Sequence, residues 1–154
     1  METLLGFKDA DIFRKALAGQ LRRYTYSIPV TSVAASSSVQ ATISVDSASD
    51  FVCNMVTGRV LRDDSIEINR AVDFAAIAMP RLEVIDAASG ASLFDRSDVS
   101  FGNIWGTSIF PLELDQPHIF EARTVITVII VNVSTTALRC QVSFHGYKQF
   151  RGAA

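Results

Sequence analysis

Hydrophobic and polar residues alternate along most of the chain after Tyr24. The alternation is clearest over 39–45, where Val, Ala and Ile alternate with Gln, Thr and Ser, and again over 138–145. A period of two places successive side chains on opposite faces of a sheet, which is typical of half-buried β-strands. Further extended segments are expected over 24–30, 51–60, 66–70, 81–95, 110–114 and 125–133. Together they predict about eight antiparallel strands, a number typical of an all-β sandwich.

Turn signals separate these segments. Ala88-Ser89-Gly90 predicts the turn of a hairpin over 81–95, and Asp115-Gln116-Pro117 predicts a second turn. Pro29 has no backbone N–H, so its strand is expected at the edge of a sheet. Residues 71–79 fit either a helix or a buried strand, which Pro80 ends in both cases.

The first 23 residues have a different periodicity. Phe13, Leu17 and Leu21 recur at helical spacing over 7–23. Arg22 and Arg23 fall in the last turn of this expected helix, where positive charge suits the helix dipole. The sequence therefore predicts an N-terminal helical arm over 1–23 and one β-sandwich domain over 24–154. The strand number favours a jelly roll, which is built from two Greek keys.

Composition narrows the class of protein. Of 154 residues, 49% are apolar and 19% are charged, and the net charge is −2. Intrinsic disorder needs the opposite balance, and a nucleic-acid partner would need a basic face. The most apolar stretch, 124–133, is shorter than the roughly 20 residues of a spanning helix. The first residues also lack the features of a secretory signal. From the charge balance and the short apolar stretch, we expect neither a nucleic-acid nor a membrane partner.

Charge is distributed unevenly along the chain. Residues 1–30 hold five basic and three acidic groups, whereas 46–115 hold five basic and twelve acidic ones. Residues 116–154 hold four basic groups and one acidic group. This distribution fits either an ordinary solvated surface or complementary contacts between neighbouring chains.

Residues suited to catalysis are few. His118 and His145 have no second ligand at metal-binding spacing, and the adjacent Asp63 and Asp64 are typical of a solvated turn. We therefore predict no catalytic, cofactor or metal site, and a protein that is not an enzyme. Two cysteines, Cys53 and Cys140, lie on the apolar side of alternating segments. Buried thiols are expected there, although the sequence leaves a disulfide between them open.

The second half of the chain has a familiar order of segments. It contains Phe110-Pro-Leu-Glu-Leu114, Pro117-His-Ile-Phe-Glu-Ala122, the β-branched segment 125–134, and Cys140-Gln-Val-Ser-Phe-His-Gly-Tyr-Lys148. With the short arm before the β domain, this order resembles the small jelly-roll capsid cement, or decoration, proteins of tailed bacteriophages. The similarity covers roughly residues 110–148 and concerns strand order rather than a diagnostic motif.

The resemblance implies a binding role in the virion. Proteins of this family are made in the bacterial host cytoplasm, usually form homotrimers, and bridge subunits of the major capsid protein on the outer shell. The weakly amphipathic arm would need a surface to dock on. Trp105, in a loop between Gly102 and Gly106, is expected either to cap one end of the sandwich or, if exposed, to add an apolar contact. The residues expected at an interface are Phe13, Leu17, Leu21, Arg22, Arg23, Tyr24, Tyr26 and Trp105. The alternatives are another phage component of the tail, neck or fibre, and a carbohydrate-binding β-sandwich module.

Overall fold

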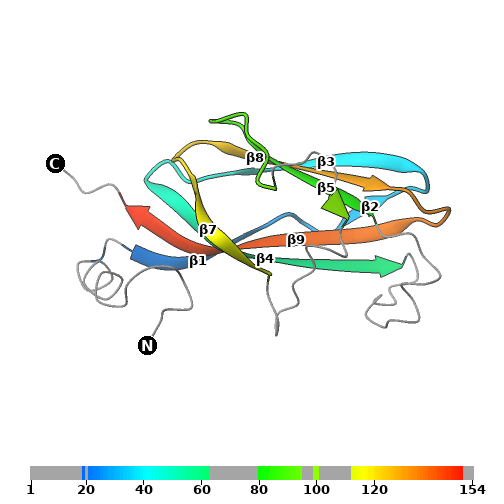
Figure 1. Ribbon diagram of the computed structural model, residues 1–154, viewed down its shortest axis with the longest axis horizontal. Coiled ribbons are helices and arrows are strands. Elements are labelled where there is room, and N and C mark those ends of the chain that lie inside the picture. Colours follow the sequence, from blue (N-terminus) through cyan, green and yellow to red (C-terminus); the bar gives the residue numbers. More distant parts are fainter. Residues whose placement is uncertain (1–18, 20, 63–79, 95–98, 101–111, 151–154) are drawn as a thin grey trace.

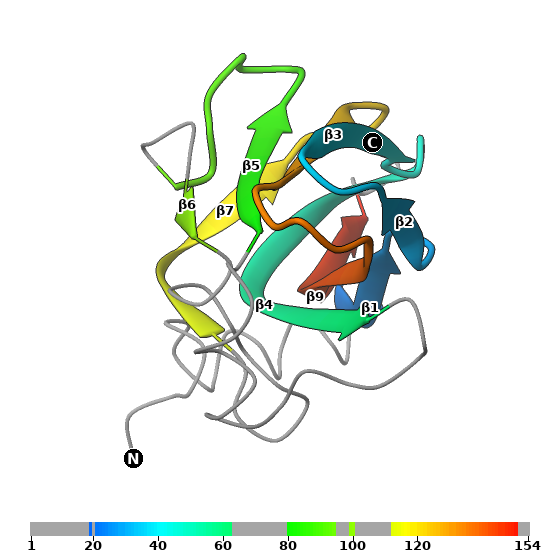
Figure 2. The ribbon, with the colours of Figure 1, turned by 90° about the vertical axis from the view of Figure 1, so that its right-hand side faces the viewer.

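Two antiparallel β-sheets pack face to face in the computed structural model of the chain (Figure 1). The structure describes residues 19, 21–62, 80–94, 99–100 and 112–150. Figure 2 looks along the sandwich from one end and shows the two layers of strands. The expected mainly-β fold and β-sandwich are therefore confirmed.

The larger sheet has the order β1-β9-β4-β7, and the short strand β2 also pairs with β9. Its strands are β1 (Leu21–Ser27), β2 (Thr31–Val33), β4 (Ser49–Arg62), β7 (Leu112–Phe120) and β9 (Leu138–Phe150). The smaller sheet has the order β3-β8-β5-β6. Its strands are β3 (Ser37–Ser44), β5 (Arg81–Asp86), β6 (Val99–Ser100) and β8 (Val125–Asn132).

Alternate residues of the long strands fill the core. In β9, every second residue from Leu138 to Phe144 is buried, while the residues between them are half-buried on the outer face. Strand β8 does the same from the opposite sheet with Ile126, Val128 and Ile130. Each fully buried aliphatic or aromatic side chain contributes about 1.5–3 kcal/mol through removal from water. The core therefore follows directly from the period-two pattern of the sequence.

The segment around Pro29 lies at an edge of the larger sheet, as the sequence predicted. Strands β1 and β2 both pair with β9, and they are interrupted between Ser27 and Thr31. A proline cannot donate a ladder hydrogen bond, so it is tolerated at an interruption of an edge strand. The prediction that this segment lies at a sheet edge is confirmed.

The boundary of the expected arm is corrected. Leu21, Arg22 and Arg23 belong to strand β1 and pair with Gln149, Lys148 and Tyr147 of β9. They are therefore not the last turn of a helix. Long-range ladder pairing outweighs the weak helical preference of this segment, which Gly19, with φ of 68°, separates from the preceding residues. The rest of the predicted helix, 7–18, lies outside the described residues.

The expected turn at 115–117 is also corrected. These residues lie inside β7, an edge strand that pairs with β4 on both sides of the segment but not across it. Such an irregular edge accommodates Pro117 without loss of a ladder bond. The turn at Ala88–Gly90 is confirmed, since Gly90 donates to the Asp86 carbonyl and adopts a φ of 67°.

A bulge in β4 depends on a glycine in β9. The register of β4 against both neighbours shifts between Cys53 and Met55, which leaves Asn54 as the extra residue. A side-chain Cβ at Gly146 would collide with the carbonyl oxygen of Val52. Glycine is therefore required where the bulged strand approaches β9 closely.

Both cysteines are free thiols buried in the core, so the question of a disulfide is settled in favour of separate thiols. Burial raises the pKa of Cys53 and of Cys140 to about 12. In the described part of the chain, no helix is long and apolar enough to cross a membrane. The undecided segment 71–79 and the expected strand at 66–70 lie outside the described residues.

Val142→Asp tests the register of β9. Val142 is 1% exposed, so the substitution places a carboxylate without a partner in the core. We expect the free energy of unfolding to fall by about 4 kcal/mol. The measurement is urea unfolding followed by tryptophan fluorescence and circular dichroism. Gln141→Asp, on the outer face of the same strand, is the control and should change stability far less. Equal stabilities would contradict the inward orientation of Val142.

Candidate interaction surface

Strand β1 brings together most of the predicted interface residues. Leu21, Arg22, Arg23, Tyr24 and Tyr26 all lie in this strand. Its side chains from Arg22 to Thr25 are exposed, and Tyr26 is half-buried. Phe13, Leu17 and Trp105 lie outside the described residues. The structure thus brings five of the predicted residues together on one strand, the first three of which the sequence assigned to a helix. Their role at an interface stays a prediction.

The outer edge of β1 is defined by its hydrogen-bond pattern. Ile28 N–H donates to the Val142 carbonyl directly opposite, at 3.0 Å. In an antiparallel pair, residues alternate between those bonded to the neighbouring strand and those directed away from it. Arg22, Tyr24 and Tyr26 are therefore bonded to β9. The backbone N–H and C=O groups of the intervening residues point to the other side: Leu21, Arg23, Thr25 and Ser27.

A buried lysine fixes β1 to the rest of the sandwich. Lys148 is 8% exposed, and its Nζ lies 3.8 Å from the ring centre of Tyr24 and 5.4 Å from that of Tyr26. The same Nζ donates to Asp46 Oδ2 at 3.0 Å. Tyr26 packs edge-on against Phe51, and its hydroxyl accepts from the Asp46 N–H. Cation–π contacts and the ion pair thus join β1, β9 and the β3–β4 connection.

The two charges of this cluster stabilise each other. Burial alone would lower the pKa of Lys148, but the hydrogen bond to Asp46 and the nearby Tyr26 and Tyr24 raise it above its usual value. The Ala48 N–H and Lys148 lower the pKa of Asp46 below its usual value. The lysine therefore remains charged in its aromatic surroundings.

A polar network covers the outer face of the larger sheet beside β1. His145 Nδ1 is hydrogen-bonded to the Thr25 hydroxyl at 3.0 Å, and Nε2 to the Thr57 hydroxyl at 2.8 Å. The imidazole thus bridges β1, β9 and β4. Burial and the nearby Arg23 lower the pKa of His145 below its usual value. Ser27 and Ser143 share a further hydrogen bond of 2.7 Å between the same strands.

A second polar cluster surrounds Asp86 at the end of β5. Its Oδ1 accepts from Ala88 N–H and the Thr124 hydroxyl, and its Oδ2 accepts from the Ser89 hydroxyl and His118 Nε2–H, all within 3.0–3.2 Å. Asp86 is 3% exposed. Burial raises the pKa of Asp86, but the bonds from Ala88, Thr124, His118 and Ser89 together bring it below its usual value.

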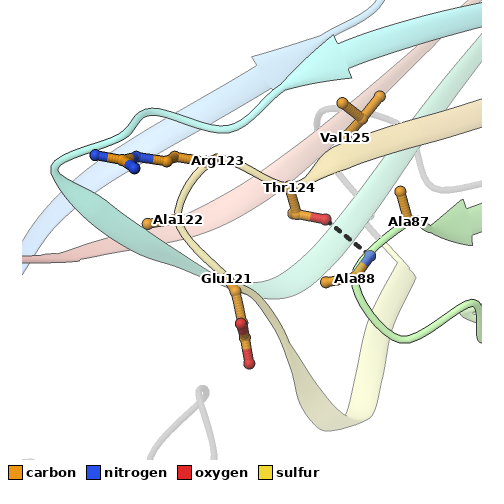
Figure 3. A pocket seen from close by; sticks show the side chains of 7 residues that line it. All are labelled: Ala87, Ala88, Glu121, Ala122, Arg123, Thr124 and Val125. Carbon is orange, nitrogen blue, oxygen red and sulfur yellow. Dashed lines mark hydrogen bonds between the residues drawn. The ribbon is translucent and has the colours of Figure 1, made fainter.

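A shallow hollow of about 320 Å³ lies beside this cluster (Figure 3). It is lined by Ala87, Ala88, Glu121, Ala122, Arg123, Thr124 and Val125. Figure 3 shows the Thr124 hydroxyl turned toward the Ala88 N–H, to which it is bonded at 3.0 Å. Both oxygens of Asp86 are already occupied by donors, and these bonds join β5, β7, the residue before β8 and the turn after β5. The geometry of this cluster is that of a structural support.

Metal ligands do not gather in the described ranges, where no group of three His, Cys, Asp or Glu could hold an ion. Sequence reasoning did not identify the Asp86 and Lys148 clusters. The sequence contained an indication of each cluster. Asp86 immediately precedes a predicted turn, where aspartate often accepts hydrogen bonds from the backbone. Lys148 continues the inward positions of β9, which makes a lysine there unusual.

Comparison of the chain with models of known protein families, and with curated proteins, gives no match. The arguments about function below therefore rest on the residues and topology of this chain.

Asp86→Ala tests the supporting role of the second cluster. The substitution removes the buried acceptor of the Thr124 hydroxyl and of His118 Nε2–H, and leaves Ala88 N–H with the Thr124 hydroxyl as its acceptor. We expect a loss of about 3 kcal/mol in the free energy of unfolding, measured by urea denaturation. Glu83→Ala, on the outward side of the same strand, is the control, with an expected change near 0.5 kcal/mol. A loss no larger than in the control would show that the four bonds contribute little.

Arg23→Gln tests the electrostatic contact between β1 and β9. Removing the guanidinium should raise the pKa of His145, as measured by NMR titration of the imidazole protons. In the wild-type protein the folded pKa is below the usual 6.5, so the unfolded chain binds the proton more tightly. The contribution of His145 to stability should therefore fall as the pH drops through about 6.5 and level off below the folded pKa. An unchanged pKa in the variant would contradict the contact.

Proposed function

We propose that this protein is a structural component of a phage virion, a cement protein that binds the outer capsid shell and bridges neighbouring capsid subunits. In this role it acts by binding rather than catalysis, and its partners are the major capsid protein and further copies of itself in a trimer. We further propose that its sandwich is a jelly roll.

The strand order is the observation that supports the proposal. Strands β1 and β2 pair with the same side of β9, so they count as one interrupted strand, which gives eight strands among the described residues. In chain order the larger sheet is then 1-8-3-6 and the smaller sheet 2-7-4-5. The first strand pairs with the eighth, the second with the seventh, the third with the sixth and the fourth with the fifth. This pairing is expected of one long hairpin wrapped into two sheets, as in a jelly roll, and it therefore supports the proposal.

The jelly roll is the fold of many viral capsid proteins, but lectin domains and cupins use it too. A fold alone does not select among these functions. The segment that resembles cement proteins, 110–148, includes all of β7 and β8 and most of β9, which come from both sheets. The basic edge strand β1 and the acidic composition of 46–115 also suit contacts between unlike surfaces. These observations favour the virion role over a sugar-binding one.

Two measurements test the proposal. Light scattering of the purified chain should give the mass of a trimer. When added to expanded capsids of the source phage that lack it, the chain should bind and raise their melting temperature in a calorimetric scan. A monomer that neither binds capsids nor changes their melting would overturn the proposal.

Two further measurements distinguish the competing functions from the proposed one. Antibody labelling confined to the tail, neck or fibre of the particle would favour another virion component. Binding on a glycan array, without capsid binding, would favour the carbohydrate-binding module.

A deletion series tests whether the N-terminal residues serve assembly. Removing 1–18 should leave the sandwich folded, with an unchanged unfolding midpoint, but weaken capsid binding. Removing 1–24 additionally deletes half of β1 and Tyr24, so the unfolding midpoint should fall as well. Equal capsid binding by the full chain and by the 1–18 deletion would contradict a role of these residues in assembly.

A further inference from the structure

The open edge of β1 has features of a binding site for a further strand. The N–H and C=O groups of Arg23, Thr25 and Ser27 point away from β9, and within the described ranges β1 pairs with no strand other than β9. Such a row of unpaired backbone groups accepts an added strand by main-chain hydrogen bonding. The exposed side chains of Arg22 to Thr25 indicate that this edge is accessible.

The edge is also held in a fixed shape. The contacts of Lys148 with Tyr24, Tyr26 and Asp46 attach the inward side of β1 to its neighbours. On the outer face of the sheet, the side chain of Thr25 is bonded to that of His145, and the side chain of Ser27 to that of Ser143. A strand that is ordered before binding loses little conformational entropy when a partner adds to it.

Charge determines which partner fits. Arg22 and Arg23 are adjacent, so their guanidinium groups lie on opposite faces of the sheet, and both are exposed. An added strand would therefore have positive charge beside each of its faces. A second β1 would bring two further arginines, and like charges on neighbouring strands are destabilising. Acidic side chains on the added strand would instead neutralise the arginines at this edge.

We propose that the β1 edge binds an extended acidic segment of a partner protein, which adds as a strand beside Leu21–Ser27. The inference rests on the proposed structural role, since it names the chemistry of the surface that the protein would contact. Main-chain bonds would supply the register, and Arg22 and Arg23 would select against neutral and basic strands.

The probe is a blocked peptide of about eight residues in which Glu alternates with Val, a length sufficient to cover β1. Its twin, with Lys in place of Glu, is the control peptide. The full chain is titrated with each and followed by NMR. We expect the Glu peptide to slow amide exchange at Leu21, Arg23, Thr25 and Ser27 by about tenfold at saturation. Exchange at Tyr24 and Tyr26, which are already bonded to β9, should change little.

Two pairs of variants separate the contribution of backbone hydrogen bonds to peptide binding from the contribution of charge. Thr25→Pro removes a backbone N–H that points away from β9, without removing a backbone bond to β9, and should weaken binding by about tenfold. Thr25→Val keeps the N–H and should bind normally, which separates the loss of the donor from the loss of the hydroxyl. Arg23→Glu should weaken binding by about fivefold, whereas Arg123→Glu, in the β7–β8 turn, should not. Raising the salt concentration should weaken binding of the wild-type chain.

Several results would overturn the inference. Equal binding of the Lys peptide would exclude charge selection, and exchange that slows without alternation would exclude strand addition. Alternating protection that grows with protein concentration in the absence of peptide would show that a second copy occupies the edge. Failure of the Glu peptide to bind, combined with normal capsid binding, would reject the acidic strand and leave the virion role intact.

Discussion

The larger sheet depends on the register of strand β9. This strand pairs with β1 and β2 along one side and with β4 along the other, over nearly its whole length. Its alternate residues enter the core, so a shift by one position would bury Arg139 and Gln141 in place of Leu138 and Cys140. The burial of one face therefore fixes the pairing of three other strands.

The two polar clusters stabilise the same end of the sandwich. Asp46 accepts from Lys148 through its side chain and from the Arg123 N–H through its carbonyl. Arg123 in turn precedes Thr124, which donates to Asp86. A continuous set of bonds thus links the edge strand β1 with the turn after β5. At this end, where the alternation of apolar residues stops, hydrogen bonds between polar groups hold the strands and turns together.

Features of the edge strand β1 that prevent aggregation also suit the binding of a partner strand. Exposed arginines and an interruption at Pro29 are features by which proteins prevent edge-to-edge aggregation. The same arginines make the edge selective for acidic partners, because repulsion disfavours strands of like charge. Rigidity from Lys148 and its aromatic neighbours would keep this edge ready for a partner without rearrangement.

The sequence by itself determined the strands of the core and their inward faces. Val39 to Val45 and Leu138 to Phe144 have a period of two, and burial of apolar side chains requires only that pattern. It also indicated the edge at Pro29 and the turn at Gly90, because both depend on local backbone chemistry.

Only the tertiary structure decided the features that arise from long-range pairing. Leu21 to Arg23 became strand because β9 extends to Phe150 and offers them partners, which no local pattern reveals. Pro117 lies within a strand because β7 is an irregular edge. Asp86 bonds to His118 and Thr124, and Lys148 contacts Asp46 and Tyr24; these four partners lie 32 to 124 positions away in the sequence. Such contacts depend on how the sheets are stacked, and the hydrophobic pattern of a single strand contains no information about its neighbours.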